Sequence, residues 1–93
     1  MEYPTEEELQ KIREWEYNDL YALFLFIKDI WNWGDDYVTI KGDPEVTITL
    51  VTGGWSGNEE IIQALSENYI VWAQCWEKSE RGGLYEFKFK KVK

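Results

Sequence analysis

The feature that most constrains the fold is the segment TGGWSGNEEIIQAL, residues 52–65, which joins an apolar strand to a helix through a glycine-rich turn. Ser56 and Glu59 stand at the spacing of a capping box, in which the serine oxygen accepts the backbone N–H three residues later. We therefore predict a helix that begins at Gly57 and ends around residue 67 or 68. Such a turn directs backbone N–H groups outward, where a small anion or carboxylate could bind.

A long first helix is predicted over residues 6–33, as the longest element of the fold. Thr5 and Glu8 form a second capping box, and Gly34 is a typical residue to follow a helix C-terminus. Between these ends, apolar residues recur at the spacing of one helix face. The part of this stripe expected to pack on the sheet is Leu20, Phe24, Ile27 and Trp31.

Four strands are predicted from the alternation of apolar and polar residues. Residues 37–41 and 46–52 form a hairpin, residues 69–76 form a nearly continuous apolar strand, and residues 84–92 alternate strictly after a polar turn over residues 78–83. The element order is αββαββ. It predicts one α+β domain over the whole chain, residues 1–93, with a four-stranded, mostly antiparallel sheet and two helices packed on one face. The residues expected to face inward from the second strand are Val46, Ile48 and Leu50.

The order of the strands follows less directly from the pattern. The second and third strands can be parallel neighbours, or an intervening strand can separate them, and a right-handed crossover fits both arrangements. If they are parallel, the loop that contains Arg81 lies beside the glycine turn. The two loops would then form one ligand or partner site, made of Trp55, Ser56, Asn58, Trp76 and Arg81.

The composition excludes several kinds of chemistry. The chain has no histidine and one cysteine, which excludes an intrachain disulfide and the usual zinc sites, and we predict no bound metal and no cofactor. Cys75 lies in an apolar run and has no histidine to act as its base, so we interpret it as a small buried hydrophobe. No carboxylate pair stands at a recognisable catalytic spacing. We therefore expect a protein that is not an enzyme.

The glycine turn does not match the known phosphate-binding patterns. It lacks the GxxxxGK[ST] spacing with its lysine, and it also lacks GxGxxG. Glu59 and Glu60 place negative charge where a phosphate would arrive. The simplest interpretation of the turn is a strand-to-helix connection whose glycines adopt positive φ, and the alternative is a binding loop.

The net charge of −8 is distributed unevenly along the chain. Residues 1–36 carry a net −7, residues 37–76 a net −4 and residues 77–93 a net +3. An acidic protein repels phosphate backbones and associates faster with basic partners. We therefore expect a protein partner with a basic surface and no direct contact with nucleic acid, the C-terminal strand being the one segment whose charge would allow such contact.

Sequence also bears on location. The longest apolar run, residues 20–27, is shorter than the roughly 20 residues that cross a bilayer, and the N-terminus does not resemble a secretory signal. The expectation is a cytoplasmic protein with no membrane partner.

The second half of the predicted first helix is apolar around most of its circumference. We expect Trp15, Trp31 and Trp33 to belong to the core. One sheet face cannot cover every apolar side chain of this helix, so a homodimer or a heteromeric contact is predicted. The residues of this interface are Tyr17, Tyr21, Leu25 and Phe26.

Three motifs, GGWSGNE, VWAQCW and SERGGLYEF, resemble those of a group of small uncharacterised phage and prophage proteins. The resemblance covers about the last 45 residues, and it departs from the pattern at Leu84, where a histidine often follows RGG. It implies a phage-type accessory protein in a bacterial host cytoplasm. That context suggests an inhibitor or adaptor that acts on a host defence protein or a nucleic-acid-handling protein.

Two functions from different classes are therefore considered. The first is a protein-binding inhibitor or adaptor that uses an acidic, aromatic surface. The second is a small-ligand module that binds or sequesters a nucleotide-type molecule through the turn over residues 53–58 and the Arg81 loop.

Overall fold

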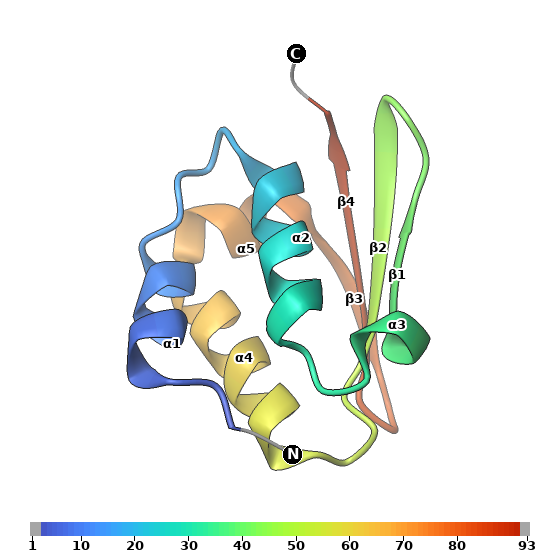
Figure 1. Ribbon diagram of the computed structural model, residues 1–93. Coiled ribbons are helices and arrows are strands. Elements are labelled where there is room, and N and C mark those ends of the chain that lie inside the picture. The colour runs from blue at the N-terminus through green and yellow to red at the C-terminus, as the bar shows by residue number, and fades with distance from the viewer. Residues whose placement is uncertain (1–2, 92–93) are drawn as a thin grey trace.

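The computed structural model describes residues 3–91 and contains a four-stranded sheet (Figure 1). The strands are β1 (Val38–Lys41), β2 (Glu45–Val51), β3 (Trp76–Glu80) and β4 (Leu84–Lys90). They lie in the order β1-β2-β4-β3, and every neighbouring pair is antiparallel. The predicted α+β class and antiparallel sheet are confirmed. Because β4 lies between β2 and β3, the second of the two strand orders allowed by the sequence is the one adopted.

Four helices cover one face of this sheet, and a short fifth helix lies at one of its ends (Figure 1). The four are α1 (Glu6–Arg13), α2 (Leu20–Ile30), α4 (Ser56–Glu67) and α5 (Tyr69–Cys75), and the fifth is α3 (Gly34–Tyr37). The longest is α4, with 12 residues.

The prediction of one long first helix was wrong, because the chain forms α1 and α2 with a connection between them. The capping box of Thr5 and Glu8 is present and starts α1. The helix ends at Arg13, where the side chain of Asn68 donates hydrogen bonds to the carbonyls of Ile12 and Trp15 at 3.0 and 3.1 Å. Those carbonyls are satisfied from another part of the chain, so α1 and α2 can pack separately. Helix α1 packs mainly against α4.

The prediction that Gly34 closes the first helix was also wrong. Helix α2 ends at Ile30, with Trp31 as its C-cap, and Gly34 begins α3. A Cβ at Gly34 would lie 2.3 Å from the carbonyl oxygen of Lys28, so the close return of the chain over the end of α2 requires a glycine there. Tyr37, predicted to start the first strand, is the last residue of α3.

The predicted capping box at Ser56 and Glu59 is absent. Helix α4 begins at Ser56, one residue before the predicted start, and its N-cap is Trp55, whose side chain makes no capping bond. Because Ser56 is already in the first turn, its hydroxyl points outward and bonds the hydroxyl of Tyr3 at 2.8 Å. The predicted end of this helix near residue 67 is confirmed.

The third predicted strand, residues 69–76, is a helix instead. Asn68 caps α5 by accepting a hydrogen bond from the N–H of Val71. Val71 and Cys75 lie one helical turn apart and are both buried, so the apolar run fits a short helix as well as it fits a strand. The strand is displaced to β3, and the polar turn shortens to residues 81–83. The end of the predicted fourth strand, at Val92, lies outside the described residues.

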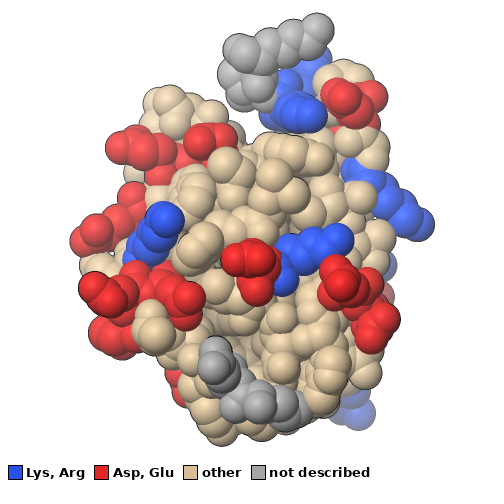
Figure 2. All heavy atoms as spheres, in the orientation of Figure 1, with Lys and Arg blue, Asp and Glu red and all other residues tan. Residues whose placement is uncertain are grey.

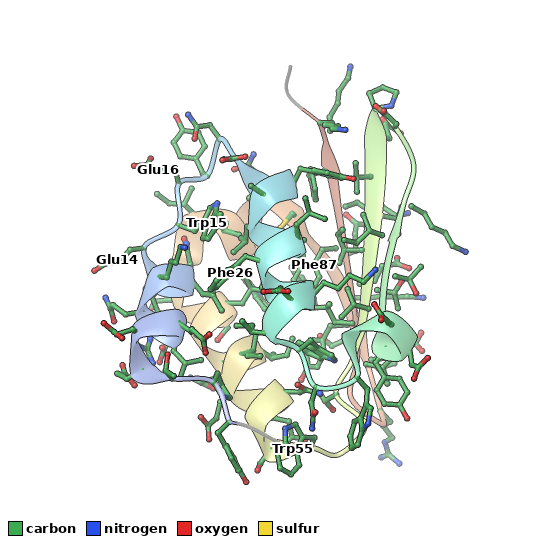
Figure 3. All side chains as sticks on the ribbon, viewed as in Figure 1. Glu14, Trp15, Glu16, Phe26, Trp55 and Phe87 are labelled. Carbon is green, nitrogen blue, oxygen red and sulfur yellow. The ribbon has the colours of Figure 1, made fainter. Side chains whose placement is uncertain are left out.

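The core lies between the helices and the sheet, as predicted. Phe24 of α2 stands 5.3 Å from Phe87 and 5.8 Å from Phe89, both on β4, and Phe87 points toward the helices (Figure 3). Truncating such rings costs several kcal/mol in other proteins, about 3–5. The predicted contacts are confirmed, because one core cluster contains Leu20, Phe24, Ile27, Trp31, Val46, Ile48 and Leu50.

Candidate binding site at one end of the sheet

The two glycine-rich turns meet at one end of the sheet. The N–H of Thr52 donates to the carbonyl of Gly83 at 3.0 Å, and a Cβ added at Gly83 would lie 2.0 Å from the hydroxyl of Thr52. Both turns lie at the lower end in Figure 1, beside α3. The glycine turn and the Arg81 loop are therefore neighbours because β4 pairs directly with β2, and a parallel third strand is not needed.

Asn58 holds this end of the molecule together. Its carbonyl oxygen accepts the N–H of Asn32 at 2.9 Å, and its amide nitrogen lies 3.3 Å from the carbonyls of Asn32 and Thr52. The side chain is 1% exposed. Because the amide is buried and already bonded on both sides, it joins the α2–α3 connection to the glycine turn and does not face a ligand.

Trp55 and Ser56 are covered by the N-terminal segment. The ring of Tyr3 lies 4.9 Å from the ring of Trp55, and its hydroxyl bonds Ser56. The indole nitrogen of Trp55 is buried without a hydrogen-bond partner, and a Cβ on Gly57 would lie 2.6 Å from it. Trp55 is therefore half-buried at the N-terminus of α4, at the bottom of the molecule in Figure 3.

Trp76 lies away from this end of the sheet. It is the first residue of β3 and pairs with Phe87 in the middle of β4, whereas Arg81 follows the last residue of β3. Five residues of strand separate the two by roughly 16 Å. Trp76 stacks on Trp72, and its indole N–H donates to the hydroxyl of Ser79. The structure thus places Trp76 on a different part of the surface from the two turns.

Trp33, which was expected in the core, instead forms an aromatic pair with Tyr37 beside the glycine turn. Trp33 and Tyr37 are 48% and 37% exposed, and their rings form a T-shaped pair with centroids 6.1 Å apart. The Tyr37 ring rests on Gly53, where an added Cβ would lie 3.3 Å from it. The expectation that Trp33 is a core residue was wrong. The run NWGDD contains the turn-forming residues that could have indicated a corner here.

The backbone of Trp33 has a conformation that bulky residues rarely adopt. Its φ and ψ are 59° and 45°, the left-handed region, and it is the one positive-φ residue other than glycine among residues 3–91. Its carbonyl accepts the N–H groups of Asp36 and Tyr37, which fixes the corner at the start of α3. The ring is thereby presented at the surface on a hydrogen-bonded turn.

The charges around this corner are mostly negative. Asp35 and Asp36 are exposed on α3, and Asp35 also lines a depression of about 340 Å³ between α2 and α3, together with Asp29 and Lys28. Arg81 is exposed at the tip of the other turn. We call the whole region the sheet-end surface. Its residues are Trp33, Asp35, Asp36, Tyr37, Gly53, Gly54 and Arg81.

The predicted interface, on α2 and the connection that precedes it, is only partly exposed. Tyr17 and Leu25 are 53% and 47% exposed, whereas Tyr21 and Phe26 are half-buried. Phe26 packs 5.5 Å from Trp15, and the two side chains point toward one another in Figure 3. Figure 2 shows acidic side chains gathered over α1, and over α2 an uncharged upper area that is followed by acidic and basic side chains near the middle of the view. Two of the four predicted interface residues are thus exposed, and the other two are partly buried within the fold.

A small cavity lies at the upper end of α2. Its volume is about 140 Å³, and it is partly enclosed by the start of α2, α5 and the end of β4. It shares Tyr17 and Tyr21 with the predicted interface. The other lining residues are Asn18, Asp19, Leu20, Gln74, Phe89, Lys90 and Lys91.

Two further features limit the chemistry of the molecule. Cys75 is 1% exposed, and burial raises the pKa of its thiol to about 12, so the reactive thiolate is disfavoured. Within residues 3–91, no group of three or more acidic, cysteine or histidine side chains is arranged to hold a metal ion. In the same part of the chain, no helix is long and apolar enough to cross a membrane.

Comparisons of the chain with protein-family models, with curated proteins and with solved structures find no match.

Proposed function

We propose that this chain is a small protein-binding module that contacts its partner through the sheet-end surface and acts as an inhibitor or adaptor. The observation that carries the proposal is the position of Trp33, which is 48% exposed at a hydrogen-bonded corner. Tryptophan and tyrosine are enriched among the residues that dominate the energy of protein interfaces. A rigid exposed pair of such rings suits this role.

The same geometry favours a protein partner over a small ligand. Of the polar groups that a nucleotide would need, Asn58 is buried and bonded within the fold, and Ser56 is bonded to Tyr3. Small-ligand sites usually enclose most of their ligand. The sheet-end surface is instead an exposed corner, which fits contact with another surface.

The proposed partner carries a basic surface, because the chain has a net charge of −8 and acids border the aromatic pair. The resemblance of the glycine-turn and RGG motifs to phage proteins suggests, as part of this proposal, a partner among the host defence or nucleic-acid-handling proteins of a bacterial cytoplasm. The proposal includes no direct contact with nucleic acid or membrane.

Affinity capture from a bacterial lysate, followed by calorimetry with the purified partner, tests this function. Trp33→Ala should weaken binding by about tenfold or more. Tyr69→Ala is the matched control, because Tyr69 is 80% exposed on α5, away from the two turns. Equal binding by the wild type and the Trp33→Ala variant would contradict the proposal.

A second contact is proposed on α2 and the connection before it, since Leu25 and Tyr17 are about half exposed. Pairing of two chains, or a heteromeric contact, would cover them. Light scattering of the wild type should give about twice the chain mass, and Leu25→Glu should return the mass to that of one chain. A wild-type protein that scatters as a monomer at all concentrations would exclude the homodimer.

A further inference from the structure

We infer that the sheet-end surface receives a cationic side chain of its protein partner, an arginine or lysine, over the ring of Trp33, with Asp35 and Asp36 as the opposing charges. This inference rests on the proposed function and names the chemistry of the partner. It concerns one contact within the surface and can fail while the surface itself still binds protein.

The contact with Tyr37 leaves at least one face of the Trp33 ring uncovered by that residue. In a T-shaped pair, an edge of one ring meets a face of the other, so the contact with Tyr37 covers one face of Trp33 at most. The exposed fraction of Trp33, 48%, agrees with this arrangement. A tryptophan face is the most favourable aromatic site for a cation.

Elsewhere, the chain supplies its own cations to aromatic rings of this kind. The ammonium of Lys11 lies 5.6 Å from the ring of Trp15 and 4.6 Å from that of Phe26, and Lys91 lies 4.2 Å from Tyr21. Among residues 3–91, none of the cation–π contacts involves Trp33. No cation from the described residues 3–91 therefore lies over the ring of Trp33.

The local charges favour a cation at this position. Asp35 and Asp36 follow Trp33 by two and three residues and are exposed, and Asp29 lines the same depression as Asp35. The nearest opposing charge on α2 is Lys28, which lines the same depression, and Arg81 is on the neighbouring turn. With three carboxylates and two cations, the net charge of the corner is still negative. A phosphate group would be repelled, whereas a guanidinium could pair with a carboxylate and stack on the ring.

The experiment uses the full chain and an acetylated nona-arginine peptide, with nona-citrulline as the uncharged control of similar shape. Binding is followed by the NMR shifts of the indole N–H groups, at about 0.15 M salt so that distant charges are screened. We expect saturable binding of nona-arginine that shifts the Trp33 signal, and no saturation with nona-citrulline.

Two pairs of matched variants separate a specific contact from attraction by net charge. Trp33→Leu should weaken nona-arginine binding about fivefold or more, while Tyr69→Leu should not, and Trp33→Tyr should restore most of the affinity. Asp35→Asn with Asp36→Asn should weaken binding about threefold or more. Glu7→Gln with Glu60→Gln removes the same charge from exposed positions on α1 and α4 and should change it less than about twofold.

Equal losses in the two double variants, or unchanged binding in Trp33→Leu, would overturn the inference. So would the absence of saturable binding by nona-arginine. The proposed function is tested separately, by the binding of the captured partner. If that partner needs Trp33 but binds equally well to the Asp35→Asn and Asp36→Asn double variant, the proposed function stands and only the cationic contact is excluded. Thermal melts confirm that each variant is folded.

Discussion

Trp31 and Trp33 stand two residues apart and have opposite roles in the structure. Trp31 is 4% exposed, and its indole N–H donates to the carbonyl of Val51 at 3.0 Å. Trp33 is 48% exposed and lies in the left-handed backbone region. The first side chain fastens the end of α2 to the sheet, and the second projects from a corner.

The residues next to these two tryptophans differ in the same way. Asn32 is held through its backbone by Asn58, so residues 31–32 form an anchored part that depends on buried contacts. Residues 33–37 form the corner, where the aromatic rings are partly exposed and the acids face solvent. A rigid anchor next to an exposed aromatic corner allows the corner to keep its shape without being buried itself. We therefore expect stability to depend on the anchored residues and partner binding to depend on the corner.

The largest effect is expected for the anchor. Trp31→Ala should lower the free energy of unfolding by about 3–5 kcal/mol, because it removes a buried ring and leaves the carbonyl of Val51 without its donor. Urea denaturation followed by circular dichroism measures the loss. A cost below about 1 kcal/mol would show that the end of α2 is not anchored by this residue.

A smaller but still substantial loss is expected at Asn58. Asn58→Ala leaves the buried N–H of Asn32 unpaired and removes the bond to Thr52, which should cost about 1–3 kcal/mol. Asn18→Ala, at an exposed position, is the control. Because Asn58 fixes the position of the corner, the variant should also bind the captured partner less tightly. Unchanged stability would mean that the amide contributes no net hydrogen-bond energy.

The sequence predicted much of the fold because its strands and capping signals are local. The alternation of β2 and β4 and the capping box at Thr5 each depend on a few consecutive residues, and the structure confirms them. The break between α1 and α2 was missed because it depends on Asn68, more than 50 residues away. The identity of α5 was missed because a short apolar run fits a strand or a helix until its packing is known.

The candidate site was only partly predictable for a related reason. The glycine turn and the Arg81 loop were expected to be neighbours, and they are, but through β4. Trp76 was placed with them only because residues 69–76 were read as a strand. Trp33 was assigned to the core together with Trp15 and Trp31, because all three lie around the predicted first helix. Its exposure follows from a turn that the helical periodicity does not reveal.

The third prediction compares glycine and alanine at the two tryptophan positions. At residue 33, Trp33→Gly should be more stable than Trp33→Ala by about 0.5–1 kcal/mol, because glycine adopts a positive φ without the steric cost that alanine carries. At residue 31, where φ is −72°, the order should reverse. Both residue 33 variants should bind the partner equally poorly. A lower stability for Trp33→Gly than for Trp33→Ala would show that the corner is not strained.

The smallest effect is expected from the ion pair between α1 and α4, which lies at the opposite end of α4 from the glycine turn. Arg13 donates from its Nε to a carboxylate oxygen of Glu67 at 2.7 Å, and this bond lowers the pKa of Glu67. A carboxylate with a lowered pKa in the folded state stabilises the fold above its ordinary pKa, and that contribution is lost as the pH falls through the folded value.

The stability difference between the wild type and Glu67→Gln should therefore be present at pH 6 to 7 and shrink on acidification below about pH 4. Urea denaturation at several pH values measures it, with Glu60→Gln as the exposed control on the same helix. The pair is exposed to solvent, so the difference should also shrink in high salt. Binding of the partner at the sheet-end surface should not change in Glu67→Gln. A loss of binding at that surface would show that α4 couples the ion pair to the corner. Stability and binding would then not depend on separate parts of the molecule.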